Sequence, residues 1–371
     1  MKDKLVGRII IILAFIIICT SKVTFFFSER FLDSANYENR NMTTRPRLTM
    51  DTYETFSNDY TEYFNDNLQY RNNLISINSI IDYYIFSRSS NNDVVVGKDD
   101  WLFYSKIEDG DPISCYQGTN LYDNDQLERL ADNCIAQRDY LLSEGKEFII
   151  FIAPNKERIY SEYMPTRYGR PSDNYRALQV YKYLKENTDL RVVYPYEELM
   201  CAKNRLEENI WYKTDSHWNS IGGYVGAKAL LSELGIDMPG IEQVKIKRVD
   251  TIAGDLANML HLREQLTIDP DYEIEGYENH EIEQLESDFF GVCSYKAAGA
   301  NPRRIYVVRD SFSTQMFPYI GSQFDNSYFR NYNTYSYEDF CEQDPDIVVL
   351  EVVERVVDRL ADFSVQKKVE E

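Results

Sequence analysis

The stretch EFIIFIAP, at residues 147–154, decides the fold class of this 371-residue chain. Its apolar run from Phe148 to Ala153 is uninterrupted and of strand length, and it ends at Pro154. A strand with apolar side chains on both faces is typical of a parallel sheet that helices cover on both sides. We therefore expect this strand to lie in the sheet of an α/β domain.

Strand-like and helix-like segments alternate around this stretch. A hairpin is predicted where VVVG (94–97) and WLFY (101–104) flank a turn at 98–100. The other expected elements are helices at 125–143, 175–187, 222–234 and 314–319, and strands at 191–194, 304–308 and 346–351. This alternation predicts a doubly wound parallel sheet flanked by helices. Ligands of such sheets bind beyond the carboxyl ends of the strands, where Asn155, Lys156 and Ser311 would lie.

The N-terminus predicts a membrane anchor. Lys2, Lys4 and Arg8 precede a long apolar run, and a helix from Leu5 to Phe27 would extend about 35 Å, enough to cross a bilayer. A cleaved signal peptide is the alternative, but no small-x-small cleavage site follows the run. We expect an uncleaved signal anchor within residues 1–30. The basic residues before it predict a cytoplasmic N-terminus, with the rest of the chain outside the cell membrane.

The segment between the anchor and the main domain is expected to be helical. After a polar linker, apolar side chains recur at three- and four-residue steps from Tyr53 to Leu68, and a second helix is predicted over 71–84. We expect residues 31–88 to form a juxtamembrane segment that packs on a single domain at 89–371.

Charge and cysteine content restrict the partners and cofactors. The net charge of −21 has no basic stripe to offset it, so it argues against nucleic acid and against a broad polyanion as partner. Five of the six cysteines follow the anchor, so they cannot all pair with one another, and Cys115 with Cys134 is the first pair to test. No Cys/His cluster has metal-ligand spacing, so we expect neither a metal nor a cofactor.

Two separated segments carry the candidate chemistry. Asp215-Ser216-His217-Trp218 holds one of only three histidines, and Ser311 follows the strand at 304–308. An acid, a histidine and a serine at a strand-to-helix turn are what nucleophilic catalysis by serine needs. Alternatively, Ser311 is a helix N-cap and His217 is a loop residue with a chance acidic neighbour.

Several ordered blocks of this chain resemble the alginate O-acetyltransferase (AlgJ/AlgX-like) family, also known as DHHW proteins. Asp215-Ser216-His217-Trp218-Asn219 resembles the Asp-x-His-Trp signature of that family. The other matching blocks are 38–40, 66–71, the hairpin VGKDDWLF (96–103), APNK (153–156) with IYSEYMP (159–165), GDLA (254–257) and DIVVLE (346–351). The catalytic domain of that family is related to SGNH (GDSL-like) hydrolases, so the resemblance implies an SGNH hydrolase-like fold.

The resemblance also implies a reaction and residue roles. Ser311 would be the nucleophile, His217 the base and Asp215 the acid that orients it, in transfer of acetyl groups to hydroxyls of an extracytoplasmic polysaccharide. Asn155 and Arg330 are candidate substrate or oxyanion contacts, although an ion-paired or surface role is the competing interpretation for Arg330. One departure is Arg309, where related hydrolases prefer a glycine before the Asp-Ser pair.

Partners and competing functions follow from the same resemblance. Because no acetyl-CoA is expected outside the cell, a multi-spanning membrane acyltransferase is expected to supply the acetyl group. Two alternatives remain open: a carbohydrate acetyl esterase with the same three residues, and a non-catalytic glycan-binding subunit. The second would be favoured if Ser311 and His217 lay too far apart to bond, or if Arg309 filled the pocket.

Overall fold

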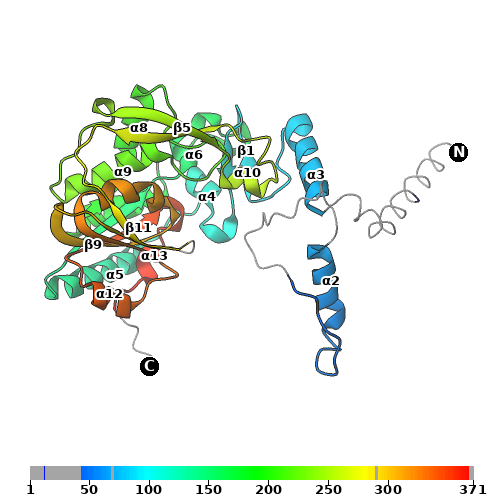
Figure 1. Ribbon diagram of the computed structural model, residues 1–371, viewed down its shortest axis with the longest axis horizontal. Coiled ribbons are helices and arrows are strands. Elements are labelled where there is room, and N and C mark those ends of the chain that lie inside the picture. The colour runs from blue at the N-terminus through cyan, green and yellow to red at the C-terminus, as the bar shows by residue number, and fades with distance from the viewer. Residues whose placement is uncertain (1–11, 13–42, 68–70, 289–290, 367–371) are drawn as a thin grey trace. The chain divides into compact units, whose positions relative to one another are not determined.

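The computed structural model describes residues 12, 43–67, 71–288 and 291–366 (Figure 1). The chain divides into two compact units, one of Met1–Ser90 with Asn258–Leu262 and one of Asn91–Ala257 with Arg263–Glu371. Apart from Ile12, the predicted anchor lies outside the described residues. Among the residues that are described, no helix is long and apolar enough to cross a membrane.

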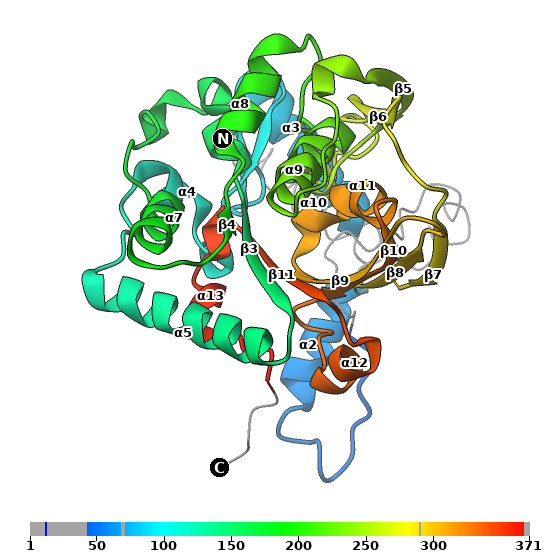
Figure 2. The ribbon, with the colours of Figure 1, turned by 90° about the vertical axis from the view of Figure 1, so that its left-hand side faces the viewer.

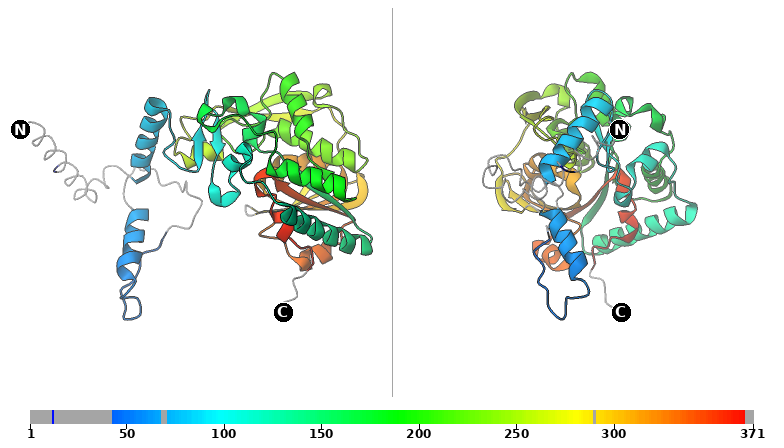
Figure 3. Two further views of the ribbon diagram at one scale, coloured as in Figure 1. Left: turned by 180° about the vertical axis from the view of Figure 1, so that it is seen from behind. Right: turned by 90° about the vertical axis from the view of Figure 1, so that its right-hand side faces the viewer.

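The first unit contains the two helices expected between anchor and main domain, α2 (Phe56–Asp66) and α3 (Arg71–Phe86), drawn in blue (Figure 3). Within α2, the rings of Phe56 and Tyr60 lie 5.7 Å apart, as the predicted stripe requires. The packing of this segment on the main domain stays a prediction, as do the domain limits at residues 30 and 88.

Strands and helices alternate through most of the second unit. Its strands are β1 (Val94–Val96), β2 (Leu102–Tyr104), β3 (Glu147–Ala153), β4 (Val192–Val193), β5 (Lys245–Ile252), β6 (Asp269–Glu275), β7 (Glu283–Ser287), β8 (Val292–Lys296), β9 (Asn301–Arg309), β10 (Phe324–Asn331) and β11 (Ile347–Val353). Its α-helices are α4 (Pro112–Gln117), α5 (Asn124–Ser143), α6 (Lys156–Ile159), α7 (Arg176–Asn187), α8 (Tyr196–Arg205), α9 (Ser220–Glu233), α11 (Phe317–Gly321), α12 (Tyr337–Gln343) and α13 (Arg359–Asp362), and α10 (Asp255–Met259) begins in this unit. Its 3-10 helices are η2 (Ile107–Asp109), η3 (Ser161–Tyr163), η4 (Thr166–Tyr168), η5 (Ile241–Gln243), η6 (Ser311–Met316) and η7 (Glu354–Val356).

Seven strands form one sheet in the order β4-β3-β11-β9-β10-β8-β7. Strands β4, β3, β11, β9 and β10 are parallel, as predicted, whereas β8 and β7 are antiparallel to their neighbours. The expectation of a parallel sheet is therefore wrong at this edge. All residues of β7 are exposed, so its sequence carries no apolar run that would have revealed it.

Apolar side chains on the two faces of the sheet build two separate cores. Along β3, Ile149 and Phe151 face one core and Ile150 and Ile152 face the other, as the two-residue period of a strand dictates. Helices α8 and α9 contribute to the first core, and α5, α7, α12 and α13 contribute to the second (Figure 2). The prediction of helices on both faces is thus confirmed.

The observed elements follow the predicted ones with shifted ends. The hairpin β1–β2, the helices α5, α7 and α9 and the strands β3, β9 and β11 are all present. The helix expected at 314–319 is instead the 3-10 helix η6 followed by α11. The chain therefore turns more tightly after β9 than an α-helix would, directly at Ser311.

The cysteine pair singled out from sequence is not formed. The five cysteines in the described part of the chain are all free. The Cys115 thiol in α4 approaches the carbonyl oxygen of Gly110, whereas Cys134 in α5 lies against the carbonyl oxygen of Leu360. The two thiols have different surroundings because proximity in sequence does not bring α4 and α5 side chains together.

Candidate active site

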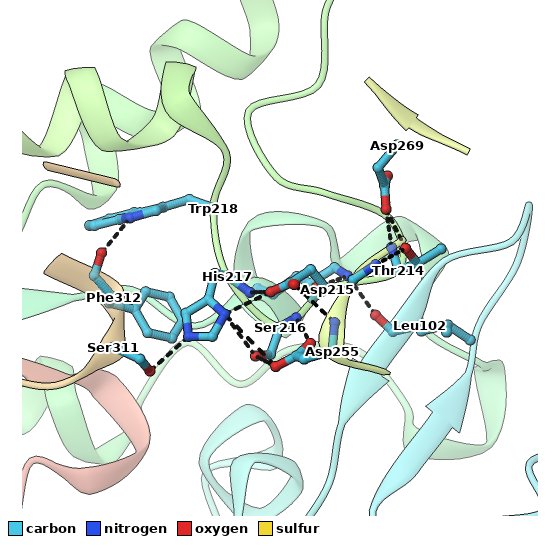
Figure 4. Close-up of polar contacts among 12 residues, drawn as sticks. Leu102, Thr214, Asp215, Ser216, His217, Trp218, Asp255, Asp269, Ser311 and Phe312 are labelled. Carbon is cyan, nitrogen blue, oxygen red and sulfur yellow. Dashed lines mark hydrogen bonds and ion pairs between the residues drawn. The ribbon is translucent and has the colours of Figure 1, made fainter. Parts of the chain in front are cut away.

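The structure brings Asp215, His217 and Ser311 into one hydrogen-bonded row (Figure 4). The Nδ1 atom of His217 lies 2.7 Å from Asp215 Oδ1, and its Nε2 atom lies 2.7 Å from the hydroxyl oxygen of Ser311. Asp215 and His217 precede α9, while Ser311 begins η6 at the carboxyl end of β9. Residues 94 positions apart are thus placed for proton transfer from a serine hydroxyl to an imidazole.

The electrostatics of the row favour a basic imidazole. Burial lowers the pKa of His217, but the negative charge and hydrogen bond of Asp215 outweigh this, so the pKa lies above its ordinary value. Burial by itself would raise the pKa of Asp215, but His217 and two backbone N–H groups outweigh burial and lower this pKa to about 2. A charged Asp215 accepts the Nδ1–H of His217, which leaves Nε2 as the acceptor for the Ser311 hydroxyl.

A second carboxylate, Asp255 at the start of α10, holds the histidine loop. It accepts hydrogen bonds from the backbone N–H of Ser216 at 2.7 Å and from the Ser216 hydroxyl at 2.6 Å. Its Oδ2 lies 3.8 Å from His217 Nδ1. The preceding residue must be glycine, because a Cβ atom at Gly254 would lie 2.3 Å from the Cβ of Asp215. Gly254 and Asp255 can therefore pack directly against Asp215.

Lys156 connects the histidine loop to the hairpin. This fully buried ammonium, just after β3, donates to the carbonyl oxygens of Leu102 at 2.6 Å, Lys213 at 2.9 Å and Asp215 at 2.8 Å. Burial lowers its pKa to about 8. The Trp101 ring lies 5.1 Å from Nζ, so the hairpin tryptophan covers the ammonium. One side chain thus fixes the backbone on which Asp215 sits.

Asp269, at the start of β6, anchors the loop from its other side. Its carboxylate accepts the backbone N–H groups of Lys213 and Thr214 and the Thr214 hydroxyl. It is 1% exposed, so these bonds form in a protected environment. The residues before Asp215 are therefore held on a rigid support.

The turn that presents Ser311 is built from a different set of bonds. Asp310 caps η6 by accepting the N–H of Phe312 at 2.9 Å, and its other oxygen accepts the N–H of Val353 at 2.7 Å. Glu351 in β11 accepts the N–H of Asp310 and the hydroxyl of Ser313. The N-cap is thus Asp310, so the alternative in which Ser311 caps the helix is wrong. The side chain of Ser311 is exposed.

Trp218 and Asn219 hold the ends of the histidine loop in place. The buried indole of Trp218 donates to the carbonyl oxygen of Phe312 at 2.8 Å, which joins the histidine loop to the serine turn. Asn219 caps α9 by accepting the N–H groups of Ile221 and Gly222. The indole bond sets the separation of the two segments that carry His217 and Ser311.

A cleft of about 630 Å³ opens beside Ser311. It is lined by Gln284, Ser287, Asp288, Gly291, Cys293, Tyr295, Arg309, Ser311, Thr314, Phe317 and Asn331. Arg309 is part of its wall and leaves the space open. The departure from glycine before the Asp-Ser pair therefore adds a charged group to the cleft without closing it.

The two further candidate contacts are placed differently. Asn155 is the N-cap of α6 and is 2% exposed, and among the described residues neither its side-chain amide nitrogen nor its side-chain oxygen has a hydrogen-bond partner. Arg330 points to the opposite face of the sheet, where it pairs with Asp339 at 2.9 Å and Glu286 at 3.0 Å. Its neighbour Asn331 lines the cleft instead, because side chains alternate along β10. Arg330 is thus ion-paired in the structure, as its competing interpretation holds.

One group of side chains in the described part of the chain has the composition of a metal site. One ligand atom each from Asp215, His217 and Asp255 lies within 4.8 Å of the others. The hydrogen bonds of Asp215 to His217 and of Asp255 to Ser216 already account for this arrangement. We therefore interpret the group as the acid side of the hydrogen-bonded row.

Sequence reasoning did not assign a supporting role to four charged residues that hold the site: Lys156, Asp255, Asp269 and Glu351. Lys156 was placed at the ligand edge of the sheet, and Asp255 and Glu351 lie in blocks that match the family, so these three residues carried a signal. Glu351 is also the one charged residue in the strand IVVLEVV. Asp269 had no such signal, because its partner Thr214 lies 55 residues away.

Sequence and structure comparisons identify the family and the fold of the chain. A family model described as the SGNH hydrolase-like domain of the acetyltransferase AlgX matches residues 94–319, which is more than half of the chain. The chain is 26% identical over 174 residues to a probable alginate O-acetylase AlgJ of Pseudomonas putida, a match that covers 46% of this chain and 42% of that protein. The chain thus spans less than half the length of that curated relative.

Two solved structures share the fold. Bacillus cereus PatB1 has a TM-score of 0.54 at 14% identity, covering 74% of this chain and 99% of that one. A DHHW family protein from Eubacterium siraeum has a TM-score of 0.51 at 16% identity, covering 67% and 92%. The resemblance inferred from the sequence motifs is confirmed by the family match. The chain belongs to the AlgX family of acetyltransferases with an SGNH hydrolase-like domain.

Proposed function

We propose that this chain is an O-acetyltransferase that moves an acetyl group, through an acyl-serine on Ser311, to hydroxyl groups of a polysaccharide. The observation that carries the proposal is the row of two 2.7 Å contacts from Asp215 through His217 to Ser311. The name of the Pseudomonas putida relative, an alginate O-acetylase, supports a polysaccharide as acceptor.

The first half-reaction loads the enzyme. His217 Nε2 takes the proton of the Ser311 hydroxyl while the oxygen attacks the carbonyl carbon of the donor's acetyl ester. The tetrahedral intermediate then collapses, and the leaving alcohol of the donor takes the proton from His217. Asp215 stabilises the imidazolium that forms between these steps, since the pKa of His217 is raised mainly by its charge.

The second half-reaction reverses these roles with a new alcohol. A sugar hydroxyl gives its proton to His217 Nε2 and attacks the acetyl carbon on Ser311. The Ser311 oxygen leaves and recovers the proton, so acetyl ester and free enzyme are the products. The cleft beside Ser311 provides space for the sugar next to the reacting atoms.

The backbone N–H of Ser311 would donate to the oxyanion of both intermediates, because the first N–H groups of a helix lack intrahelical acceptors. Asn155 is a further candidate donor. Its buried carboxamide has no hydrogen-bond partner in the described structure, which is unusual for a buried amide.

Location and donor complete the proposal. The apolar run at residues 5–27 with basic residues before it supports a single-pass anchor in the cell membrane and an extracytoplasmic catalytic domain. A multi-spanning membrane acyltransferase would supply the acetyl group in that compartment.

A carbohydrate acetyl esterase is the second candidate function. Ser311 is exposed and its cleft is open, so water would have access to an acyl-serine. The third candidate, a non-catalytic glycan-binding subunit, would be favoured by a Ser311–His217 distance too long for a hydrogen bond or by an Arg309 that fills the cleft. Neither is found, because Ser311 and His217 are 2.7 Å apart and Arg309 leaves the cleft open.

The test uses the full-length chain in a mild detergent with a chromogenic acetyl ester and an oligosaccharide acceptor. We expect a burst of ester cleavage, an acetyl group on Ser311 by mass spectrometry, and its transfer to the sugar. Ser311→Ala and His217→Ala should each lower turnover by about 10⁴-fold or more.

Ser143→Ala at the end of α5 and His280→Ala, between β6 and β7, serve as matched controls and should retain activity. Fast hydrolysis without transfer would favour the esterase. Wild-type protein that neither forms the adduct nor turns over the ester would refute the enzymatic proposal.

A further inference from the structure

Arg309 is the last residue of β9 and lies two positions before Ser311, and both residues line the cleft. Only 7% of Arg309 is exposed. Its guanidinium lies 5.0 Å from the ring centre of Phe317, which also lines the cleft. A charged group is therefore buried in the wall of the space next to the nucleophile.

The hydrogen-bonding capacity of this guanidinium is largely unused. It offers five N–H donors, of which two make long bonds, Nη1 to the Asp310 carbonyl at 3.3 Å and Nη2 to the Gly291 carbonyl at 3.2 Å. Its Nε is buried without an acceptor. Within the residues that the structure describes, no carboxylate forms an ion pair with Arg309, although buried arginines normally have one.

The acids near Arg309 are engaged elsewhere. The Asp310 carboxylate accepts the N–H groups of Phe312 and Val353. Glu351 Oε2 accepts the N–H of Asp310 at 2.9 Å and the hydroxyl of Ser313 at 2.8 Å, and burial raises the pKa of this carboxyl well above its ordinary value. Asp288 also lines the cleft, and its Oδ1 accepts the N–H groups of Gly291 and Val292.

We infer that Arg309 binds an anionic oxygen group, a carboxylate or a phosphate, on the acceptor sugar and thereby determines which sugars are acetylated. The inference rests on the proposed transferase function. A guanidinium pairs with two oxygens of such a group in a planar, two-bonded geometry. The cleft volume of about 630 Å³ lies within the range of about 300–1,000 Å³ that is usual for small-molecule sites.

Other residues of the cleft suit the rest of a sugar. Gln284, Thr314 and Asn331 carry amide and hydroxyl groups that can bond sugar hydroxyls, and Tyr295 and Phe317 provide aromatic surface. Arg309 adds the charge that would select one kind of sugar from another. Because Arg309 ends β9 two positions before Ser311 and both residues line the cleft, the anionic group would bind close to the hydroxyl that accepts the acetyl group.

The net charge of the chain limits the kind of acceptor. At −21, the protein repels a dense polyanion at long range, whereas Arg309, which is 7% exposed, acts at short range. The acceptor that reconciles both facts is a glycan with an isolated anionic group near the reacting hydroxyl. Salt that screens the long-range repulsion should therefore not weaken acceptor binding strongly.

The test compares three trisaccharide acceptors that differ at one sugar: one glucuronic acid, the same sugar with its carboxyl reduced to an alcohol, and the same sugar with a 6-phosphate. The full-length wild type, Arg309→Gln and Arg304→Gln are acetylated with the chromogenic ester. Arg304 lies earlier in β9, where it pairs with Asp344, and is the matched control. Transfer kcat/KM is measured for each acceptor, and the Kd of each is measured by calorimetry without donor.

In the wild type, one or both anionic trisaccharides should show kcat/KM and affinity about tenfold or more above the neutral one. Arg309→Gln should remove that preference, with the rate of Ser311 acetylation and the neutral acceptor little changed, while Arg304→Gln should behave as wild type. The ratio of the carboxylate and phosphate arms identifies which anion is bound.

Equal use of all three acceptors by the wild type would overturn the inference, as would an Arg309→Gln variant that loses activity equally toward all three. The second result would assign Arg309 a structural role in holding Gly291. Failure of Ser311 to become acetylated would instead refute the transferase proposal, and the calorimetric preference would still decide the role of Arg309.

Discussion

The two sides of the candidate site differ in how completely their polar groups are bonded. On the histidine side, which comprises Asp215, His217 and the residues that hold their loop, Lys156 and Asp269 each make three hydrogen bonds. On the serine side, which comprises the turn at Ser311 and its cleft, buried atoms of Arg309 and Glu351 have no partner in the described structure.

This difference indicates that the histidine side holds the catalytic side chains in place, whereas the serine side is available to bind a ligand. The hydrogen bonds of Asp215, Lys156 and Asp269 keep the imidazole in one orientation, which proton transfer requires. Unpaired polar groups cost folding free energy and are expected where a ligand completes them. We infer that the histidine side is built for rigidity and the serine side for binding.

The largest expected effect on the histidine side comes from Lys156→Met. Three buried carbonyl oxygens would lose their donor, so the free energy of unfolding should fall by about 3 kcal/mol, and turnover should fall because the Asp215 backbone is no longer held. Chemical denaturation and ester cleavage measure the two effects. Lys247→Met, which removes only exposed ion pairs with Glu273 and Glu275, is the control and should cost less than about 1 kcal/mol. Equal stability of the two variants would show that Lys156 does not support the loop.

A smaller effect is expected from Asp255→Asn, and it concerns pH. The base must be neutral, so acylation should decline as pH falls through the raised pKa of His217, with a midpoint above 6.5. Removing the Asp255 charge removes one of the contributions that raise this pKa, so the midpoint should move to lower pH by up to about one unit. The pH dependence of the burst rate measures the shift. A midpoint that stays in place would mean that Asp255 only bonds Ser216.

The smallest effect is expected from Glu351→Gln on the serine side. Because the folded-state pKa of Glu351 is raised, its favourable contribution is complete below its ordinary value of 4.5 and is lost as pH rises toward the folded-state pKa. The amide keeps the oxygen that accepts from Asp310 and Ser313, so below pH 4.5, where the acid and the amide are both uncharged, stability should change by less than about 1 kcal/mol. Relative to wild type, the variant should gain stability as pH rises above 4.5.

Thermal unfolding across that pH range tests the expectation, with Glu351→Leu as the contrasting variant that removes both acceptor bonds. A large loss of stability in Glu351→Gln at neutral pH would show that Glu351 is charged. It would then be a buried counter-ion for Arg309, and the comparison between the two sides of the site would fail.

Much of the fold was predictable because apolar periodicity is a local property. The run at 148–153, the hairpin around Trp101 and the helix at 125–143 were all visible, and each exists in the structure. Strands β7 and β8 were not predictable in the same way. β7 is exposed throughout, and β8 is a short strand in which Cys293 and Ser294 are the buried residues, so neither shows the continuous apolar run of a central strand.

The types of the candidate catalytic residues were predictable from the sequence. The residues that hold their loop in place were not. Asp215 and His217 are two positions apart, so their contact could be expected from sequence alone. The partners of Asp255 and Asp269 depend on how distant segments pack, and the sequence gives no distance between them. The opposite roles of Arg309 and Arg330 depend on which sheet face each side chain occupies.

By itself, the sequence determined the α/β class, the family motifs and the residue types of the candidate site, because these depend on local patterns of hydrophobicity and on short motifs. Only the tertiary structure decided that His217 and Ser311 meet, that the cleft beside Ser311 is open, and that Arg309 is buried there with no ion-paired carboxylate among the residues described. The physical reason is that long-range contacts arise from strand order and side-chain alternation, which no single segment encodes.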